Sequence, residues 1–403
     1  MDSANTHGSL PYLDTQTRAF IENPNAELGT GAERIAMART VFGTELYAYD
    51  LARLCFRDRC FGNRSAAYFA ERGASPLIMT FIDNGNFNMM APEQHARVRA
   101  VMVKGFTPPR VEAARSQIVA QAEHLADTIA PLGRCNFVSE FAHYFSIGVV
   151  SAFIGIPPED VRTFDRATVE LRLLGQVPLQ PGIPRLESAL VTLHDYGAKL
   201  VERKRSAPGP DFVSDLIAVQ RDGGKLSPEE LVWSIAGVLL AGHDTTRYQL
   251  AACVRVALEH GLWETLAARP DLVPALVNEA LRLYPATPRQ IKILLEDMTI
   301  GGEPFRAGEV IAPNMGAAGR DPSVFANPDR ADLFRAEPLY DIGFGYGAHY
   351  CLGHALAKSE LVEGMTVLTQ RFTDVAIDGP MAMKTTGVIA GLEELPLRYC
   401  ART

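Results

Sequence analysis

The sequence predicts a mainly α protein with a small β-rich portion, folded as one domain over residues 1–403. Three observations lead to this prediction. Apolar residues recur at three- and four-residue intervals through most of the middle of the chain, as in amphipathic helices. One stretch, from Ser227 to about His260, is predicted to be a single long helix whose middle is apolar on every face. Strand-like segments are few and lie near the two ends, and no Ser/Gly-rich linker divides the chain.

The helices follow from spacing and from the residues that bound them. Residues 111–131 carry the helical apolar spacing, and a similar pattern over 189–206 ends in a segment containing Pro and Gly. The long helix begins at Ser227, because Ser-Pro-Glu-Glu supplies an N-cap, a proline at the first helical position and a glutamate for a capping box. It would be roughly 50 Å long. A helix of this length and burial organises a large core.

The predicted strands are short. Thr44–Tyr49 alternates, Met298–Ile300 and Val310–Ala312 suggest a hairpin-like ribbon around a Gly-Gly pair, and the last twenty or so residues suggest another small hairpin.

Composition narrows the function classes. The net charge is −8, from 39 basic and 47 acidic residues, and no long Lys/Arg run is present, so a nucleic-acid-binding surface is not indicated. The polar start lacks the apolar run of a signal peptide or membrane anchor, so we expect a soluble, cytoplasmic protein that makes no membrane contact. The six cysteines form no Cys-x-x-Cys pair and are expected to be reduced thiols.

A glycine-rich stretch, Asp341–Ala357, contains the most informative cysteine. Gly343, Gly345 and Gly347 precede Cys351, and a helix pattern follows it. Dense glycines let the backbone turn and lie flat against a bulky ligand. A cysteine just before a helix start is placed where backbone N–H groups favour the thiolate. Cys351 is therefore a candidate metal ligand or nucleophile.

Two other interpretations of this loop fit less well. A dinucleotide-binding fingerprint over Gly343-x-Gly345-x-x-Ala348 lacks the preceding apolar strand and the βαβ context that this motif needs. A nucleophilic cysteine needs a histidine base, and His349 lies in the same local turn, where it would point elsewhere.

The pattern Phe344-Gly345-x-Gly347-x-His349-x-Cys351-x-Gly353 resembles the haem-binding loop of the cytochrome P450 family. The resemblance implies a cytochrome P450 fold, with haem b (iron protoporphyrin IX) between the long central helix and the cysteine loop. It makes Cys351 the axial thiolate, which favours O–O cleavage. Phe344 would pack beside the cysteine, Gly345 and Gly353 would shape the loop, and His349 would reach a haem propionate.

A second motif is Glu279-Ala-Leu-Arg282, in a predicted helix. On an exposed helix such a pair is commonplace and worth a few tenths of a kcal/mol. It is similar, however, to the Glu-x-x-Arg motif of the same family, which implies a buried pair that braces the cysteine loop together with a downstream arginine, here Arg335.

A third motif, Ala241-Gly242-His243-Asp244-Thr245-Thr246, interrupts the apolar middle of the long helix. By itself it indicates a locally wetted helix face. It also resembles the oxygen-activation motif of the family. That resemblance implies a turn widened at Gly242, proton relay from water by Asp244, and a hydrogen bond from Thr245 to the oxygen that leaves as water.

Further basic residues correspond to haem contacts. His95 and Arg99 are four apart and share a helix face, which on its own indicates a solvated basic face; the resemblance implies that they reach the propionates. Lys292 stands where the family commonly has an arginine and lacks the bidentate fork. Arg289 is nearby and would share that role or face the substrate. Gly319 and Asp341 also depart from residues common in the family.

The substrate contacts are predicted by position. The resemblance implies that Ser75–Met90 corresponds to a loop over the distal haem face, and Arg289 is a candidate partner for a carboxylate or phenolate. Ordinary core packing is an equally good interpretation of each apolar member. The candidates are Met79, Phe81, Met89, Val238, Ala241, Thr287, Arg289, Ile291 and Val388.

The resemblance implies a haem-thiolate monooxygenase that inserts one atom of dioxygen into a small organic substrate, with secondary metabolism as the expected setting. No flavin or iron–sulfur segment is visible, so a ferredoxin and its reductase would supply electrons, docking on a proximal basic patch of Arg97, Lys104, Arg110 and Lys358. A carrier-protein-tethered substrate stays open. The alternatives are a haem-binding sensor or carrier without turnover, against which Asp244 and Thr245 count, and a helical scaffold without haem.

Overall fold

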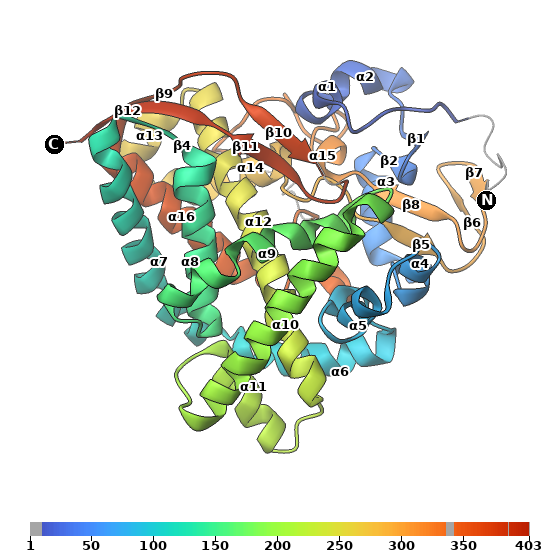
Figure 1. Ribbon diagram of the computed structural model, residues 1–403. Coiled ribbons are helices and arrows are strands. Elements are labelled where there is room, and N and C mark those ends of the chain that lie inside the picture. The colour runs from blue at the N-terminus through green and yellow to red at the C-terminus, as the bar shows by residue number, and fades with distance from the viewer. Residues whose placement is uncertain (1–9, 336–341, 386, 403) are drawn as a thin grey trace.

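The long central helix organises the fold. The computed structural model describes residues 10–335, 342–385 and 387–402. Helix α12 (Pro228–Glu259) runs through the middle of the molecule (Figure 1). Its start follows from the sequence: the Ser227 hydroxyl accepts a hydrogen bond from the Glu230 amide, and the Glu230 carboxylate accepts one from the Ser227 amide. The capping box and the length predicted for this helix are confirmed.

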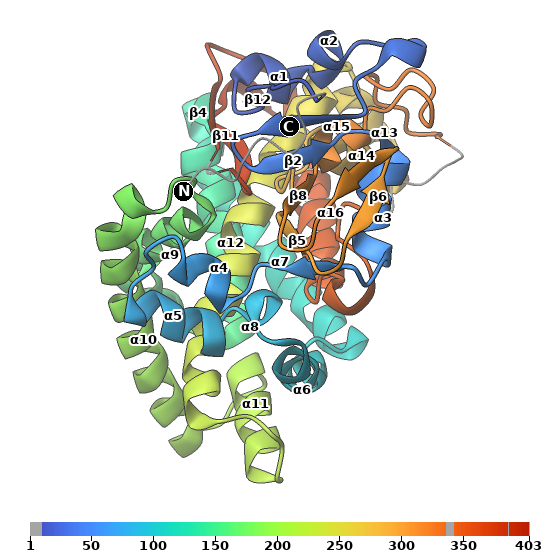
Figure 2. The ribbon, with the colours of Figure 1, turned by 90° about the vertical axis from the view of Figure 1, so that its right-hand side faces the viewer.

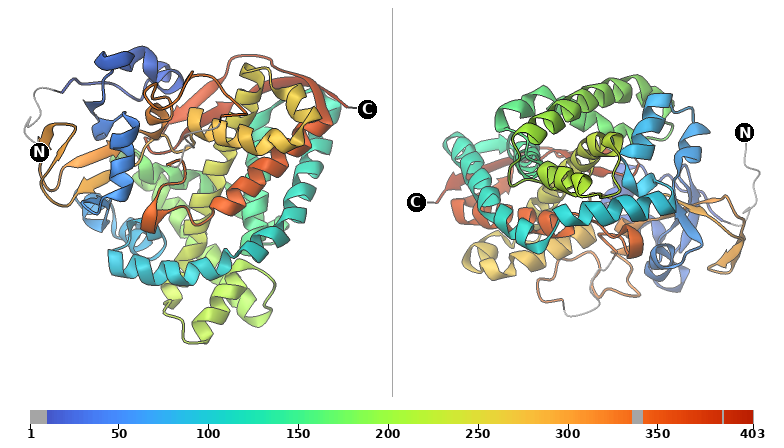
Figure 3. Two further views of the ribbon diagram at one scale, coloured as in Figure 1. Left: turned by 180° about the vertical axis from the view of Figure 1, so that it is seen from behind. Right: turned by 90° about the horizontal axis from the view of Figure 1, so that it is seen from below.

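Other helices enclose α12. It packs against α8 (His143–Ile154), α10 (Ile183–Ser206), α14 (Val273–Leu283) and α16 (His354–Arg371), while α7 (Pro108–Ile129) packs on α16 and α8. Figure 3 shows α16 and α7 from behind. The remaining helices are α1 (Arg18–Glu22), α2 (Pro24–Leu28), α3 (Tyr49–Arg57), α4 (Ala66–Ala70), α5 (Pro76–Asn84), α6 (Pro92–Met102), α9 (Asp165–Glu170), α11 (Phe212–Arg221), α13 (Trp263–Ala268) and α15 (Met315–Ala318).

The largest sheet lies on one side of the helices, as Figure 2 shows. Its order is β1 (Met37–Thr40), β2 (Gly43–Leu46), β8 (Val310–Pro313), β5 (Lys292–Leu294) and β3 (Phe61–Asn63). All neighbours are antiparallel except β2 and β8. The smaller sheets pair β6 (Met298–Ile300) with β7 (Glu303–Phe305), β10 (Ala382–Thr385) with β11 (Ala390–Glu394), and β12 (Pro396–Ala401) with β4 (Arg134–Asn136) and β9 (Phe372–Ile377).

The mainly α prediction is confirmed, and three local expectations are corrected. The ribbon that starts at Met298 pairs with Glu303–Phe305, whereas Val310–Pro313 joins the large sheet. The strand at Thr44 ends at Leu46, because Tyr49 already opens α3. The segment 75–90 is mostly helix, with Ser75 capping α5 through its hydroxyl.

All six cysteines are free, as expected. Among the described helices, none is long and apolar enough to cross a membrane.

Candidate active site

The loop that carries Cys351 is shaped by its glycines. The Cys351 amide donates to the Phe344 carbonyl over 2.9 Å and closes the loop on itself. Gly345 and Gly347 have φ angles of +74° and +65°, a region that residues with a Cβ rarely adopt. Gly353 is the N-cap of α16, which packs against α12. The Phe344 ring lies on α16, 6.4 Å from the His354 ring and 5.6 Å from Lys358 Nζ. Asp341 lies outside the described residues.

Burial controls the charge of the Cys351 thiol. It raises the pKa above the ordinary value, against a backbone hydrogen bond from Gly353 and the charge of Arg99, which lower it. The backbone N–H at the helix start thus favours the thiolate, but desolvation outweighs this effect. A metal cation at the sulfur reverses this balance, since a coordinating thiol is deprotonated.

Four basic side chains gather beside the loop. His95 and Arg99 project from α6, Lys292 opens β5, and His349 precedes the cysteine. The rings of His95 and His349 stack with centroids 4.0 Å apart. Arg99 Nη2 donates to the Tyr350 carbonyl over 2.6 Å. The hydrogen bond between Arg99 and Tyr350 thus joins residues that are 251 positions apart in the sequence.

These four basic side chains have no anionic partner among the described residues. His95 Nε2, Arg99 Nη1 and His349 Nδ1 are buried without a hydrogen-bond partner, and within the described chain none of the four groups pairs with a carboxylate. Burial and the neighbouring positive groups lower the pKa of His349 to about 3, and burial lowers that of Lys292 to about 8. Unpaired buried polar groups are costly. Two propionates beside a cysteine ligand are what this arrangement fits, so the residues present fit a haem.

The middle of α12 has a local opening. Most of this helix is buried, but Leu240, Ala241, Gly242 and Thr245 are partly or fully accessible. The Thr245 hydroxyl donates to the Ala241 carbonyl over 2.6 Å, and the Ser146 hydroxyl from α8 donates to the His243 carbonyl over 2.7 Å. Ala241 and Thr245, four residues apart, thus share an accessible face of an otherwise packed helix.

Gly242 has a different role from the one expected. The helix is continuous through this position, and a Cβ on Gly242 would come 2.9 Å from Val150 Cγ2. The glycine therefore allows α12 to approach α8 closely.

Asp244 is enclosed, with a side-chain exposure of 3%. Arg247 Nη2 lies 2.9 Å from Asp244 Oδ1 as an ion pair, and neither carboxylate oxygen has a hydrogen-bond partner among the described residues. Burial raises the pKa of Asp244, although Arg247 and Arg172 act in the opposite direction. A carboxyl whose pKa is raised at a buried position is suited to holding and releasing a proton.

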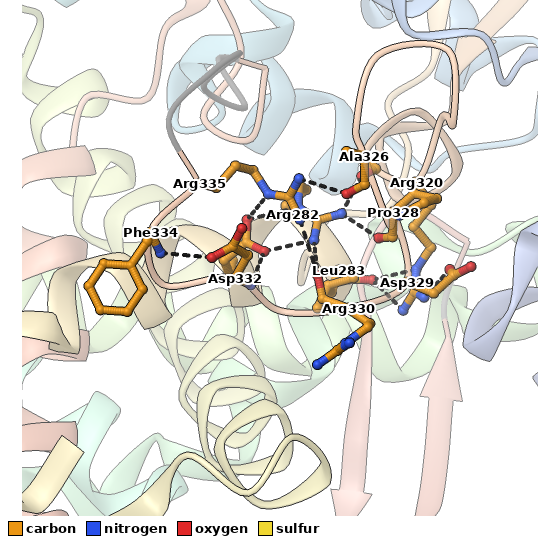
Figure 4. A network of polar contacts seen from close by, with 12 residues as sticks. Arg282, Leu283, Arg320, Ala326, Pro328, Asp329, Arg330, Asp332, Phe334 and Arg335 are labelled. Atoms are coloured by element: carbon orange, nitrogen blue, oxygen red, sulfur yellow. Dashed lines mark hydrogen bonds and ion pairs between the residues drawn. The ribbon is translucent and has the colours of Figure 1, made fainter. Parts of the chain in front are cut away.

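The Glu-x-x-Arg pair is buried and central to a network (Figure 4). Arg282 donates from Nε and Nη2 to the two oxygens of Glu279 over 2.9 and 2.8 Å. Arg335 Nε donates to Glu279 Oε1 over 3.1 Å. The network also holds the backbone of the segment that leads to the cysteine loop, through the carbonyls of Gly319, Pro328 and Arg330 and the amide of Asp332.

The expected substrate residues divide into two groups. Met79, Met89, Thr287 and Val388 are partly buried, Ala241 is accessible, and Val238 and Ile291 are buried. Ile291 and Val388 pack into one apolar cluster with Phe42 and Ala312.

Two members of the set are corrected. Phe81 is fully buried, with its ring centroid 5.5 Å from that of Trp233, so it joins α5 to α12 in the core. Arg289 is equally enclosed and lies 3.2 Å from Glu45 Oε1. Its remaining donors go to the carbonyls of Gly387 and Thr15. No charge is therefore left for a substrate or a propionate.

The expected proximal basic patch is also reduced. Arg97 pairs with Glu230 at 2.5 Å and donates to the Lys225 carbonyl, and Arg110 pairs with Asp215. These arginines tie α6 and α7 to α11 and α12. Lys104 and Lys358 are the members that stay exposed.

Sequence reasoning missed a polar network behind Asp244. Arg172 Nη1 donates to Glu393 Oε1 over 2.7 Å and to the Tyr248 hydroxyl over 2.9 Å, while Arg247 Nη2 lies 3.7 Å from the same carboxylate. The spacing of Asp244 and Arg247 was visible as an i,i+3 pair. The contribution of Glu393 was not, because it comes from a distant strand.

Comparisons with known proteins agree with this geometry. The family model described as Cytochrome P450 matches residues 263–399. Luteothin monooxygenase of Streptomyces thioluteus is 31% identical over 97% of this chain and 97% of its own. Mycinamicin IV hydroxylase/epoxidase of Micromonospora griseorubida is 33% identical over 73% of this chain and 74% of its own. The structure of P450BioI in complex with hexadec-9Z-enoic acid ligated acyl carrier protein superposes with a TM-score of 0.84 and 26% identity, covering 94% of this chain and 99% of that one.

The similarity to a known monooxygenase extends over almost the whole sequence. It agrees with the basic groups beside the cysteine loop and with the acid and the alcohol on the central helix. The chain belongs to the cytochrome P450 family and is a haem-dependent monooxygenase.

Proposed function

We propose that this P450 binds haem b and that the Cys351 thiolate would hold its iron. His95, Arg99, Lys292 and His349 would pair with its propionates. The observation that carries this proposal is the buried basic cluster beside the cysteine loop, in which His95 Nε2, Arg99 Nη1 and His349 Nδ1 have no hydrogen-bond partner among the described residues. Phe344, Gly345 and Gly353 would hold the loop against the haem face. Glu279, Arg282 and Arg335 would keep the approaching segment in place through the network in Figure 4.

Asp244 and Thr245 would supply protons. Bound haem supplies the iron at which dioxygen is activated. The Thr245 hydroxyl lies on the accessible face of α12 and can turn from the Ala241 carbonyl toward a ligand. Asp244 holds its proton at a buried carboxyl, and a water between Oδ2 and Thr245 would carry it forward. In this reaction class one atom of dioxygen would leave as water and the other would enter the substrate, and Asp244 and Thr245 would provide the protons for the water.

We propose a small organic substrate and a tailoring step in secondary-metabolite biosynthesis, the setting of the relatives named for luteothin and mycinamicin. Met79, Met89, Val238, Ala241, Thr287, Ile291 and Val388 would line its pocket. A carrier-tethered substrate is supported by the acyl-carrier complex of P450BioI. A ferredoxin and its reductase would supply electrons, docking near Lys104 and Lys358, and we place the protein in the cytoplasm as a single domain.

The first test is the absorption spectrum of the reduced protein exposed to carbon monoxide. A strongly red-shifted Soret band in the wild-type protein, lost in Cys351→Ser, supports thiolate ligation. A histidine-type band, or no haem in well-folded, haem-supplied protein, contradicts it.

A second test separates turnover from mere haem binding. Asp244→Asn and Thr245→Ala should keep the haem spectrum while diverting reductant to hydrogen peroxide. Unchanged product yield per reductant in both variants would contradict the assigned roles.

A further inference from the structure

Two histidines connect the surface of α8 to the buried acid of α12. His143 begins α8 and is partly exposed, whereas the His243 side chain is fully enclosed. Their facing nitrogens, His143 Nδ1 and His243 Nε2, are 3.2 Å apart, within hydrogen-bond distance. The two rings meet edge to face, with centroids 4.9 Å apart. The pair therefore bridges two helices at the level of the Asp244 motif.

The second nitrogen of His243 points to Asp244. His243 Nδ1 lies 3.5 Å from Asp244 Oδ1 and has no hydrogen-bond partner among the described residues. Adjacent residues on a helix do not usually face each other, so this approach places the ring nitrogen beside the carboxyl rather than in the apolar core. A small rotation of either side chain would bring the two atoms within hydrogen-bond distance.

We propose that His143 and His243 form the route by which protons pass from solvent to Asp244. The inference rests on the proposed role of Asp244 as the proton donor of the site. An imidazole accepts a proton at one nitrogen and releases another from the opposite nitrogen, so two rings in series can pass one proton to Asp244 while both rings end neutral.

The transfer balances as a relay of one proton. Solvent delivers a proton to His143 Nε2, and the proton on His143 Nδ1 passes to His243 Nε2. The proton on His243 Nδ1 then passes to Asp244 Oδ1. Asp244 ends protonated and both imidazoles end neutral with exchanged tautomers. Ring reorientation restores the starting tautomers before the next proton.

The surrounding charges suit this route. Groups that face it are Arg247 on α12, Arg172 in the segment Leu171–Gly175, Glu393 on β11, Lys384 on β10 and Asp165 on α9. Burial, with Arg247 next, lowers the pKa of both histidines, that of His243 well below its usual value. Both rings are thus neutral near pH 7, each with one donor and one acceptor. Burial raises the pKa of Asp244, so the carboxyl takes up the proton readily.

The test follows the protonation of Asp244 directly in the ferric, haem-loaded protein. After a rapid pH drop, the carboxyl stretch is recorded by time-resolved infrared spectroscopy and assigned with Asp244→Asn. We expect His143→Phe to slow its appearance at least tenfold, and free imidazole to restore part of the rate. His143→Gln, which keeps a hydrogen-bonding group but carries no proton in this way, should be as slow. The control is His124→Phe, an exposed histidine on the neighbouring α7, which should match the wild type.

The outcomes distinguish a failure of the histidine route from a failure of the proposed role of Asp244. An unchanged infrared rate in folded His143→Phe or His143→Gln overturns the histidine route, even if Asp244→Asn still diverts reductant to peroxide. If Asp244→Asn leaves product yield per reductant unchanged, the proposed role of Asp244 fails instead. A slow, imidazole-rescued rate supports the route, since a merely structural histidine would not respond to added imidazole.

Discussion

Arg289 and Glu45 form an ion pair with no exposure to solvent: Arg289 Nε lies 3.2 Å from Glu45 Oε1, with side-chain exposures of 1% and 0%. Glu45 also accepts hydrogen bonds from Thr15 and Asn314, each over 2.6 Å. The pair joins β2 to the segment between α14 and β5, and through Gly387 to the turn between β10 and β11. Arg289 therefore holds these segments together and is not available to bind the substrate.

Removing only Arg289 should damage stability more than binding. We expect Arg289→Met to lower the free energy of unfolding by about 3–5 kcal/mol, because Glu45 is left as an uncompensated buried charge. Urea denaturation of the haem-loaded protein measures this, and adding Glu45→Gln should recover part of the loss. Weakened substrate binding in an Arg289→Met protein of undiminished stability would restore the substrate role.

The Glu279–Arg282 pair should tolerate no change of geometry. Arg282→Lys keeps the charge but loses the two-pronged contact and the backbone bonds, and we expect a loss of about 2–4 kcal/mol in unfolding free energy. The matched control is Arg269→Lys, whose pair with Asp271 is more than half exposed on both sides and should cost under about 0.5 kcal/mol. Equal effects at the two sites would contradict a bracing role.

The lowered pKa of Glu230 should make the free energy of unfolding fall in acid. Hydrogen bonds from Arg97, Ser227 and Gln94 outweigh burial and lower the pKa of Glu230 to about 2. A carboxyl whose folded pKa lies below its unfolded value stabilises the fold above the unfolded pKa, and this contribution disappears as the pH falls toward the folded pKa. Glu230→Gln should thus cost about 2–3 kcal/mol at pH 7, and the difference from the wild type should shrink below about pH 4.5.

Denaturant titrations from pH 7 to pH 3 measure that difference. The control Glu112→Gln removes a carboxyl that is 75% exposed and should show no such trend. A Glu230→Gln penalty that stays constant with pH would show that the carboxylate charge is irrelevant.

Gly242 tests helix packing against helix propensity. Alanine is favoured over glycine in a helix interior by about 1 kcal/mol, but a Cβ here would lie 2.9 Å from Val150 Cγ2. Overpacking in a well-packed core typically costs about 1–3 kcal/mol, so Gly242→Ala should be destabilising overall.

Gly148→Ala on α8 is the matched comparison. Its added Cβ meets the movable end of Gln121, at 2.7 Å from Nε2, so we expect it to be neutral or stabilising. Thermal unfolding of both variants decides the point. A stabilised Gly242→Ala protein would show that α8 and α12 can move apart enough to accept the added Cβ, which would contradict the close packing argued here.

Lys292 should control haem retention through its charge. Burial lowers its pKa to about 8 when no anion is bound, and a propionate would raise it again. Lys292→Leu should lose haem faster to an acceptor protein, by about tenfold, whereas Lys292→Arg should hold it. Because the propionate would keep Lys292 protonated in the haem-bound protein while the haem-free protein loses this proton near pH 8, haem affinity of the wild type should also fall above about pH 8. Equal haem loss in all three proteins would remove Lys292 from the haem site.

The sequence alone determined the fold class and the long helix. The capping box at Ser227, the apolar spacing of 111–131 and the glycines before Cys351 are local signals, so residues close in sequence carry them. Likewise, Glu279 and Arg282 are three positions apart, and their pairing needs only a helix. Motif resemblance supplied the expected roles of His95, Arg99 and His349, because spacing cannot say what a basic residue binds.

Tertiary structure decided the partners. From the sequence, Arg289 was a candidate substrate contact and Arg97 a candidate surface residue. In the structure, Arg289 pairs with Glu45 and Arg97 pairs with Glu230, which come from distant elements. The motif suggested a widened turn at Gly242, whereas the structure shows that this glycine packs against Val150 of α8. Nothing in the sequence singled out His143, because its contact with His243 joins two different helices. Ion pairing and close packing depend on which elements meet in space. Local sequence determines the elements, and long-range packing determines what each side chain has left to do.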